Sequence, residues 1–107
     1  MGPLLLWIEQ NIRRPLSLSV IARQAAVSTR TLSRRFREQV GATPVQWIAR
    51  ARVRRAQQLL ETTGLSIERV ATEAGFRSAS VLREHFGGML GTTPLAYRRA
   101  FGSVRNQ

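Results

Sequence analysis

Apolar residues recur along this 107-residue chain at intervals of three and four, which is the spacing of one face of an α-helix. Short stretches of Ser, Thr, Gly and Pro separate the apolar runs. The pattern predicts an all-α fold of seven helices. We expect these helices over residues 3–13, 17–25, 28–40, 43–61, 66–74, 78–90 and 93–101.

Residues suited to helix ends stand at the predicted boundaries. A Ser or Thr before a helix accepts a hydrogen bond from a free backbone N–H of the first turn. Proline fits directly after such a cap, and glycine readily adopts the left-handed conformation that ends a helix. The expected caps are Ser17, Ser28, Thr43, Ser66, Ser78 and Thr93, with Pro44 and Pro94 at first helical positions and Gly41 and Gly91 as terminators.

The ranges 17–25 and 28–40 have the pattern of a helix-turn-helix. Leu32 and Phe36 mark the buried side of the second helix. Arg30, Arg34 and Arg37 fall roughly opposite them, at about 100° per residue. Arginine on such a helix can donate two hydrogen bonds to guanine in the major groove of DNA. A solvated basic helix face fits the same pattern, so this pair alone leaves both interpretations open.

The second half of the chain repeats this unit. Ser17, Ile21 and Ala26 fall 49 positions before Ser66, Val70 and Gly75, and one residue is then added. A repeat of this length indicates a duplicated supersecondary unit. Later matches are 50 positions apart and pair Ser28, Leu32, Phe36, Gly41, Thr43, Pro44 and Trp47 with Ser78, Leu82, Phe86, Gly91, Thr93, Pro94 and Tyr97. The equivalence of Trp47 and Tyr97 predicts a shared packing role.

The predicted helix 43–61 joins the two copies. At about 1.5 Å per residue it spans about 27 Å, and successive major grooves on one face of B-DNA lie about 34 Å apart. We therefore expect a first helix-turn-helix subdomain over residues 1–42, a linker helix over 43–62 and a second helix-turn-helix subdomain over 63–107. Such a chain would contact two successive major grooves.

The side chains of this linker helix divide between a core and water. Arg52 of this helix and Arg98 of the predicted helix 93–101 are expected to pin helix ends or to pair with glutamates. We expect Ile48, Ala56, Leu59 and Leu60 to be buried, Val45 and Val53 to be buried in part, and Arg50, Arg54 and Gln57 to face water.

Charge narrows the choice of partner. The chain has 17 basic residues, all Arg, against six acidic residues, all Glu, which gives a net charge of +11. On a helical chain that is 43% apolar, this balance favours a polyanionic partner, most often nucleic acid. Acidic lipid and acidic protein surfaces are the alternatives.

The composition also argues against several classes of protein. The chain has no Cys, no Asp and a single His, so no nucleophile–base pair, metal cluster or phosphate-binding loop can be assembled from it. We therefore expect no enzyme, no cofactor and no metal. No stretch approaches the roughly 20 apolar residues of a membrane span. We expect a cytoplasmic protein that does not enter a membrane.

Three stretches carry a resemblance to a known family: VSTRTLSRRFREQVGATPVQW, RVRRAQQLL and GFRSASVLREHFGGMLGTTPLAYRRAF. With them the chain resembles the DNA-binding domain of the AraC/XylS family of bacterial transcription regulators. Its second half is most similar to the subgroup whose N-terminal domain resembles class I glutamine amidotransferases. The positions that match the family pattern are Gly75, Phe76, Ser78, Phe86, Gly91, Pro94, Tyr97 and Arg98.

The resemblance implies a seven-helix domain that contacts bases through the second helix of each helix-turn-helix. By position, the implied base contacts are Arg30, Ser33 and Arg34, followed by Ala79, Ser80 and Arg83. Glu84 stands where many family members carry a basic, base-reading residue. An acid can accept from cytosine N4 but is repelled by phosphates. We therefore expect the first half of the chain to dominate affinity.

Phosphate contacts form a second group of predictions. Arg37, Arg54 and Arg77 are expected to touch phosphates, although solvation alone also explains Arg54 and Arg77. Ser28 and Ser78 are caps first. The free N–H groups at the helix starts that they cap can also hold phosphates.

These patterns together predict sequence-specific binding of double-stranded DNA and regulation of transcription. One alternative is a basic helical adaptor that docks acidic protein surfaces, such as RNA polymerase subunits. Another is a non-specific nucleic-acid binder. We expect the domain to be monomeric, because no apolar face is left over once both bundles close. We also expect that the full-length protein can oligomerise.

Overall fold

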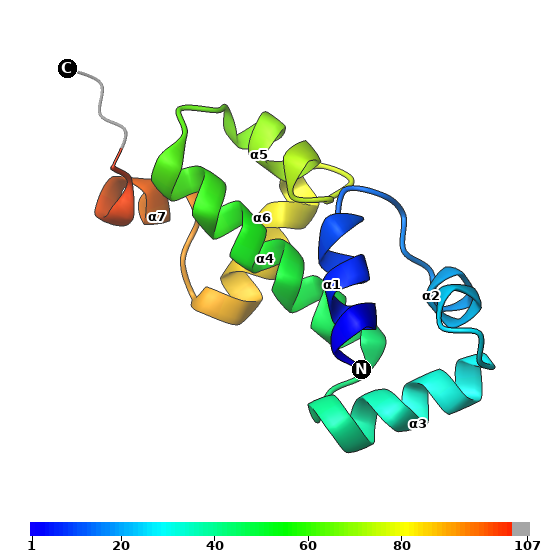
Figure 1. The fold of residues 1–107 in the computed structure, drawn as a ribbon. Helices are drawn as coiled ribbons and strands as arrows, with labels where there is room; N and C mark the ends of the chain where they lie inside the picture. The colour runs from blue at the N-terminus through cyan, green and yellow to red at the C-terminus, as the bar shows by residue number, and fades with distance from the viewer. Residues whose placement is uncertain (104–107) are drawn as a thin grey trace. The chain divides into compact units, whose positions relative to one another are not determined.

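The computed structural model describes residues 1–103, and these form seven α-helices and no strand (Figure 1). The all-α prediction is therefore confirmed. The helices are α1 (Gly2–Gln10), α2 (Leu18–Gln24), α3 (Thr29–Val40), α4 (Pro44–Thr62), α5 (Ile67–Glu73), α6 (Ala79–Leu90) and α7 (Pro94–Phe101).

The predicted caps are present at every expected start. Ser28 Oγ accepts from the Thr31 backbone N–H at 3.1 Å, and Ser78 Oγ accepts from that of Val81 at the same distance. Ser17, Ser66 and Thr93 make the same type of bond. At α4 the contact is reciprocal: Thr43 Oγ1 accepts from the Gln46 N–H, and Gln46 Oε1 accepts from the Thr43 N–H, both at 3.1 Å. This capping box, Thr-x-x-Gln, was readable in the sequence and was missed.

Residue contacts divide the chain within α4 into two compact units, residues 1–51 and the residues from Arg52 onward. We call them the first unit and the second unit. Each contains one helix-turn-helix, α2–α3 or α5–α6, whose two helices contact each other. The expected division into three parts stays a prediction.

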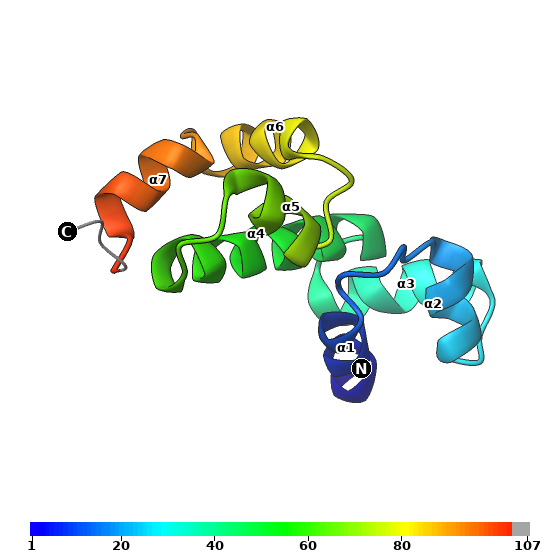
Figure 2. The same ribbon diagram turned by 90° about the horizontal axis from the view of Figure 1, so that it is seen from above.

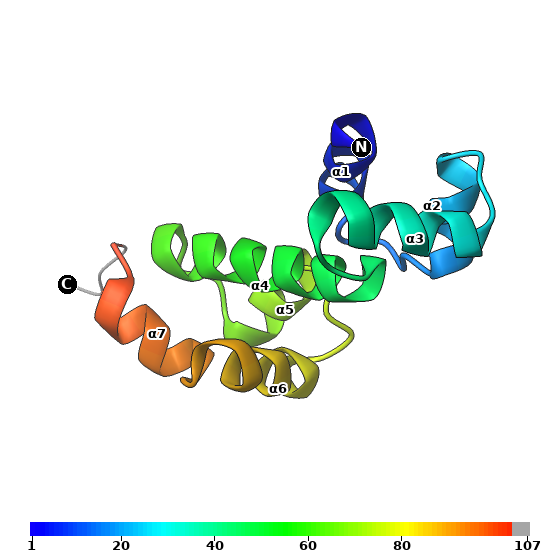
Figure 3. The same ribbon diagram turned by 90° about the horizontal axis from the view of Figure 1, so that it is seen from below.

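The first unit is built around a cluster of buried aliphatic side chains. Ile8 of α1, Ile21 of α2 and Leu32 of α3 are completely or almost completely buried. Phe36 is buried beside them, and Ile48 from the start of α4 closes the cluster. Figure 3 shows α3 leading through a short loop into α4. The side of α3 that carries Leu32 and Phe36 is therefore fixed toward the core, as predicted.

The second unit repeats this construction. Leu60 of α4, Val70 of α5 and both Leu82 and Phe86 of α6 are fully buried in one cluster. In Figures 1 and 2, α7 lies beside the C-terminal end of α4. Tyr97 of α7 packs against this cluster from the edge.

Equivalent aromatic pairs close the two units. Phe36 and Trp47 meet edge to face with ring centroids 6.5 Å apart and an interplanar angle of 72°. Phe86 and Tyr97 meet with centroids 5.4 Å apart at 73°. This geometry is favourable for aromatic rings. The predicted shared packing role of Trp47 and Tyr97 is confirmed.

Three expectations were wrong in detail. α1 ends at Gln10, short of residue 13, and the Asn11 side-chain amide donates to the Trp7 carbonyl at 2.8 Å. Val45 is 67% exposed in the first turn of α4, although Ile48, one turn later on the same side of the helix, is buried. Gln57 is half-buried and donates to the Tyr97 hydroxyl at 3.3 Å.

Candidate nucleic-acid interface

The exposed side of α3 carries the predicted base contacts. Arg30 and Arg34 are exposed and Ser33 is half-buried, whereas Leu32 and Phe36 on the opposite side are at most 1% exposed. The anchoring residues thus prevent the helix from turning the arginines inward. This arrangement presents guanidinium groups, which carry several N–H donors each, to an external acceptor.

Arg34 is held by a residue that was not predicted to take part. Its Nη1 lies 3.7 Å from Oε1 of Glu38, and both side chains are 60% exposed. An exposed pair four residues apart on a helix is worth about 0.3–0.5 kcal/mol, so it restrains Arg34 without locking it. The spacing of four residues between Arg34 and Glu38 could have predicted this ion pair from the sequence.

Ser28 and Arg37 flank this surface. The Ser28 hydroxyl accepts from the Thr31 N–H at 3.1 Å and donates to Thr31 Oγ1 at 3.0 Å. It is therefore engaged locally, and a phosphate contact here would come from the free backbone N–H groups of the first turn of α3. Arg37 is exposed one turn after Arg34.

The equivalent surface on α6 is much less basic. Ser80 and Arg83 are exposed and Ala79 is half-buried, as a base-contacting surface requires. Glu84 is exposed on the same side. Ser78 caps the helix, and Arg77, the residue added in the second copy of the repeat, is exposed just before it.

The remaining side of α6 serves packing. The His85 ring lies against Phe76 with centroids 5.5 Å apart, and His85 is half-buried. Gly87 and Gly88 do not end the helix, which continues to Leu90.

Arg54 on α4 is exposed, in keeping with a role at the surface. Arg52, two residues earlier, is half-buried, and this burial lowers the pKa of its guanidinium below the ordinary value. The two arginines therefore lie in different environments although both belong to α4.

Arg98 of α7 pins the end of α4, which is one of the two roles expected of it. Its Nε donates to the Leu60 carbonyl at 3.4 Å and its Nη2 donates to the Thr63 carbonyl at 3.2 Å. The last carbonyls of a helix lack partners within the helix, and a cation there is favourable. The Tyr97 hydroxyl donates to the Glu61 carboxylate. Burial, followed by this contact, raises the pKa of Tyr97 above its ordinary value.

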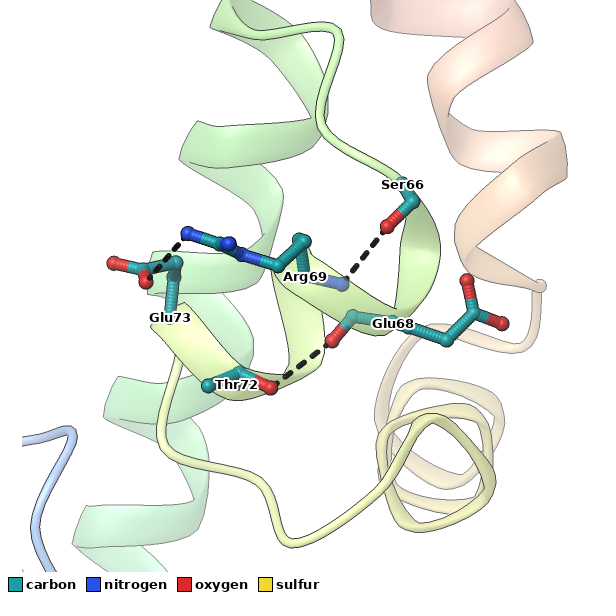
Figure 4. A network of polar contacts seen from close by, with 5 residues as sticks. All are labelled: Ser66, Glu68, Arg69, Thr72 and Glu73. Carbon is teal, nitrogen blue, oxygen red and sulfur yellow. Dashed lines mark hydrogen bonds and ion pairs between the residues drawn. The ribbon is translucent and has the colours of Figure 1, made fainter.

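α5 supports α6 as α2 supports α3. Figure 4 shows its polar side, where Arg69 lies 3.5 Å from Glu73 and the Thr72 hydroxyl donates to the Glu68 carbonyl at 3.2 Å. These contacts are internal to α5 and its cap. They occupy Arg69, which was not among the predicted DNA contacts.

Residues 1–103 also bear on metal binding and on membrane insertion. No group of three or more His, Cys, Asp or Glu side chains is placed to hold a metal ion in this part of the chain. None of the helices described there is both long and apolar enough to cross a membrane.

Several proteins of known sequence are similar to this chain. A family model described as a helix-turn-helix domain matches residues 21–100. The transcriptional regulator GlxA of Rhizobium meliloti is 38% identical over 96 residues, which are 90% of this chain and 30% of GlxA. The transcriptional activator AarP of Providencia stuartii is 35% identical over 95 residues, 89% of this chain and 70% of AarP.

Solved structures agree with the sequence relatives. The DNA-binding domain of the global transcriptional factor AdpA, determined in complex with a target DNA, is 40% identical with a TM-score of 0.90, covering 94% of this chain and 90% of that domain. An AraC-type regulator from Chromobacterium violaceum is 30% identical with a TM-score of 0.85, covering 97% and 96%. The chain therefore belongs to the AraC/XylS family of transcription regulators, as a helix-turn-helix DNA-binding domain.

Proposed function

We propose that this domain binds double-stranded DNA with sequence specificity through α3 and α6, each in a major groove, and thereby regulates transcription in the bacterial cytoplasm. The observation that carries the proposal is the exposed side of α3, where Arg30 and Arg34 lie opposite the buried Leu32 and Phe36. The likeness to a domain bound to its target DNA supports it. In this proposal, the two contacted blocks of bases lie about ten base pairs apart, one helical turn.

The proposed base contacts are Arg30, Ser33 and Arg34 on α3, and Ala79, Ser80 and Arg83 on α6. Arg37, Arg54 and Arg77 are the proposed phosphate contacts, together with the backbone at Ser28 and Ser78. Their exposure supports these roles. Since α3 has four arginines and α6 has one, we expect α3 to contribute most of the affinity.

The chain spans about 30% of the length of GlxA. A sensor domain related to amidotransferases, contact with RNA polymerase and oligomerisation of a longer protein are therefore proposals about that protein. The monomeric state of the domain also remains a prediction. The expectation behind it, that no apolar surface is left over once both bundles close, was wrong. Large apolar side chains are exposed on the second unit at Met89, Leu90, Leu95 and Phe101.

The decisive experiment selects bound duplexes from a random library and then compares variants on the selected site. Arg34→Ala should cost about 1–3 kcal/mol on that site and relax the preference at one or two base pairs. The matched control is Arg35→Ala, which removes the same charge from the neighbouring position. Arg35 borders a groove of about 330 Å³ shared with α1, on another side of α3. The Arg35→Ala variant should therefore leave the base preferences unchanged.

Each alternative function predicts a different outcome. A non-specific nucleic-acid binder would yield no enriched sequence and a steep dependence of affinity on salt. An adaptor for acidic proteins would show no DNA preference and no effect of Arg34→Ala on DNA binding. Equal losses for Arg34→Ala on selected and scrambled duplexes would contradict the assignment of α3 to the major groove.

Arg54 tests the phosphate contacts separately. Arg54→Ala should weaken binding to all duplexes alike and reduce the slope of log affinity against log salt by about one. The Arg54 side chain is exposed, and thermal unfolding of the variant checks that the fold is retained. A loss restricted to particular bases would contradict a phosphate role.

A further inference from the structure

α6 carries a carboxylate at the position where α3 carries its central guanidinium. Glu84 follows Arg34 by 50 residues, the spacing that also relates Leu32 to Leu82 and Phe36 to Phe86. Both Arg34 and Glu84 are exposed. Because the buried anchors match, the carboxylate of Glu84 projects from α6 as the guanidinium of Arg34 projects from α3.

The surroundings of Glu84 differ from those of Arg34 in a consistent way. On α3, Arg37 and Glu38 follow, and Glu38 lies 3.7 Å from Arg34. On α6 the same positions are Gly87 and Gly88. A side-chain carbon added at either glycine would meet nothing within 4 Å, so internal packing does not require them. Glycine inside a helix is destabilising. Here it leaves the surface beside Glu84 open to close approach by another molecule.

Within residues 1–103, no ion pair or hydrogen bond engages the Glu84 carboxylate. This differs from Glu38 and Glu73, which pair with arginines, and from Glu61, which accepts from Tyr97. A free carboxylate directed at DNA is repelled by phosphates. The repulsion is offset when the carboxylate accepts a hydrogen bond from the amino group of a base. In the major groove cytosine N4 is the usual partner of Glu, whereas guanine presents acceptors at N7 and O6 and thymine presents one at O4.

We propose that Glu84 is a specificity-determining residue that accepts a hydrogen bond from N4 of a cytosine in the second half-site. At that base it disfavours guanine and thymine by repulsion between acceptors. The inference rests on the proposed function, since it requires α6 to lie in the major groove. The inference gives α6 a role in selecting the DNA site, although the low positive charge of α6 does not predict such a role.

The test uses the whole chain and a duplex library in which the first half-site is fixed and the second is randomised. The wild type should prefer cytosine at one position, by about tenfold over guanine. Glu84→Gln should shift that preference toward adenine, because Gln pairs with adenine N6 and N7. Glu84→Arg should shift it toward guanine. Glu68→Gln, which removes an exposed carboxylate from α5, should leave all preferences unchanged.

One result would overturn the inference: Glu84→Gln and Glu68→Gln raise affinity for every duplex to the same extent, with base preferences unaltered. Glu84 would then act only as a negative charge. Arg34→Ala in the same library separates this failure from that of the proposed function. If Arg34→Ala removes selectivity at the first half-site, DNA reading by α3 stands and only the role of Glu84 fails. Thermal unfolding of each variant confirms that the fold is retained.

Discussion

The first and second units share their caps, turns and buried anchors and differ most in what their second helices expose. Ala26 and Gly75 occupy the same turn position, and each donates its N–H to the carbonyl three residues earlier, that of Arg23 or Thr72, at 3.1 Å. The pairs Phe36–Trp47 and Phe86–Tyr97 meet at nearly the same interplanar angle. The comparison teaches that caps, turns and buried anchors preserve the unit, whereas the exposed side of its second helix is free to change.

The largest chemical difference lies on that second helix. α3 has four arginines and one glutamate, and α6 has one of each. Because the exposed positions contribute little to the core, arginine, glutamate and glycine replace one another there without altering the fold. Each unit can therefore contact different bases from the same framework.

A second difference concerns how the helix after each helix-turn-helix is attached. Ile48 of α4 and Arg98 of α7 are equivalent in the repeat. Ile48 is 4% exposed in the core of the first unit, whereas Arg98 donates to carbonyls at the end of α4. The first unit thus uses apolar burial where the second uses hydrogen bonds.

The largest expected effect is on the anchors. Phe36→Ala and Phe86→Ala should each cost about 3–5 kcal/mol through the cavity left behind. Both tryptophans, Trp7 and Trp47, belong to the first unit. Urea unfolding followed by tryptophan fluorescence therefore reports the first unit, and circular dichroism reports both.

If the units unfold independently, Phe36→Ala will lower the fluorescence midpoint and Phe86→Ala will leave it unchanged. An equal decrease for both variants would show that the units unfold together through α4. Circular dichroism should detect a loss of stability against urea for both variants. This control shows that each substitution has an effect even where the fluorescence midpoint does not change.

A smaller effect is expected at the attachment of α7. Arg98→Met keeps an unbranched side chain as far as the ε position and removes the two hydrogen bonds that Arg98 donates to carbonyls. It should destabilise the second unit by about 1–3 kcal/mol, because hydrogen bonds to a charged group are stronger than neutral ones. Ile48→Val in the first unit, expected to cost about 0.5–1.5 kcal/mol, is the matched comparison. Unchanged unfolding of Arg98→Met by circular dichroism would mean that the aromatic contacts suffice.

The smallest expected effect is at the turns. Ala26 has a φ of +58°, a conformation unfavourable for alanine, whereas Gly75 has a φ of +90°. Ala26→Gly should stabilise the first unit by up to about 1 kcal/mol, and Gly75→Ala should destabilise the second by about 1 kcal/mol or more. Thermal melts of the two variants provide the measurement. Destabilisation by Ala26→Gly would mean that unfolded-state entropy outweighs the strain.

The sequence by itself determined the helices, their caps, the repeat and the sides of α3 and α6 that face outward. These features depend on residues within a few positions of one another: Ser28 with Thr31, Leu32 with Phe36, and Gly41 with its positive φ. Such short-range signals survive without knowledge of the rest of the chain. Arg30 and Arg34 could be chosen as candidate contacts for the same reason, whereas Arg83 was implied by the family resemblance.

Other features were decided only by the tertiary structure. Gln57 reaches Tyr97, and Arg98 reaches Leu60 and Thr63, across 35 to 40 residues of sequence. Long polar side chains have several rotamers of similar energy, so a distant carbonyl or hydroxyl selects among them once the helices pack. The burial of Val45 was also predicted wrongly because the sequence does not show tertiary neighbours. Its exposure depends on which neighbours cover the first turn of α4, and the helical pattern does not contain that information.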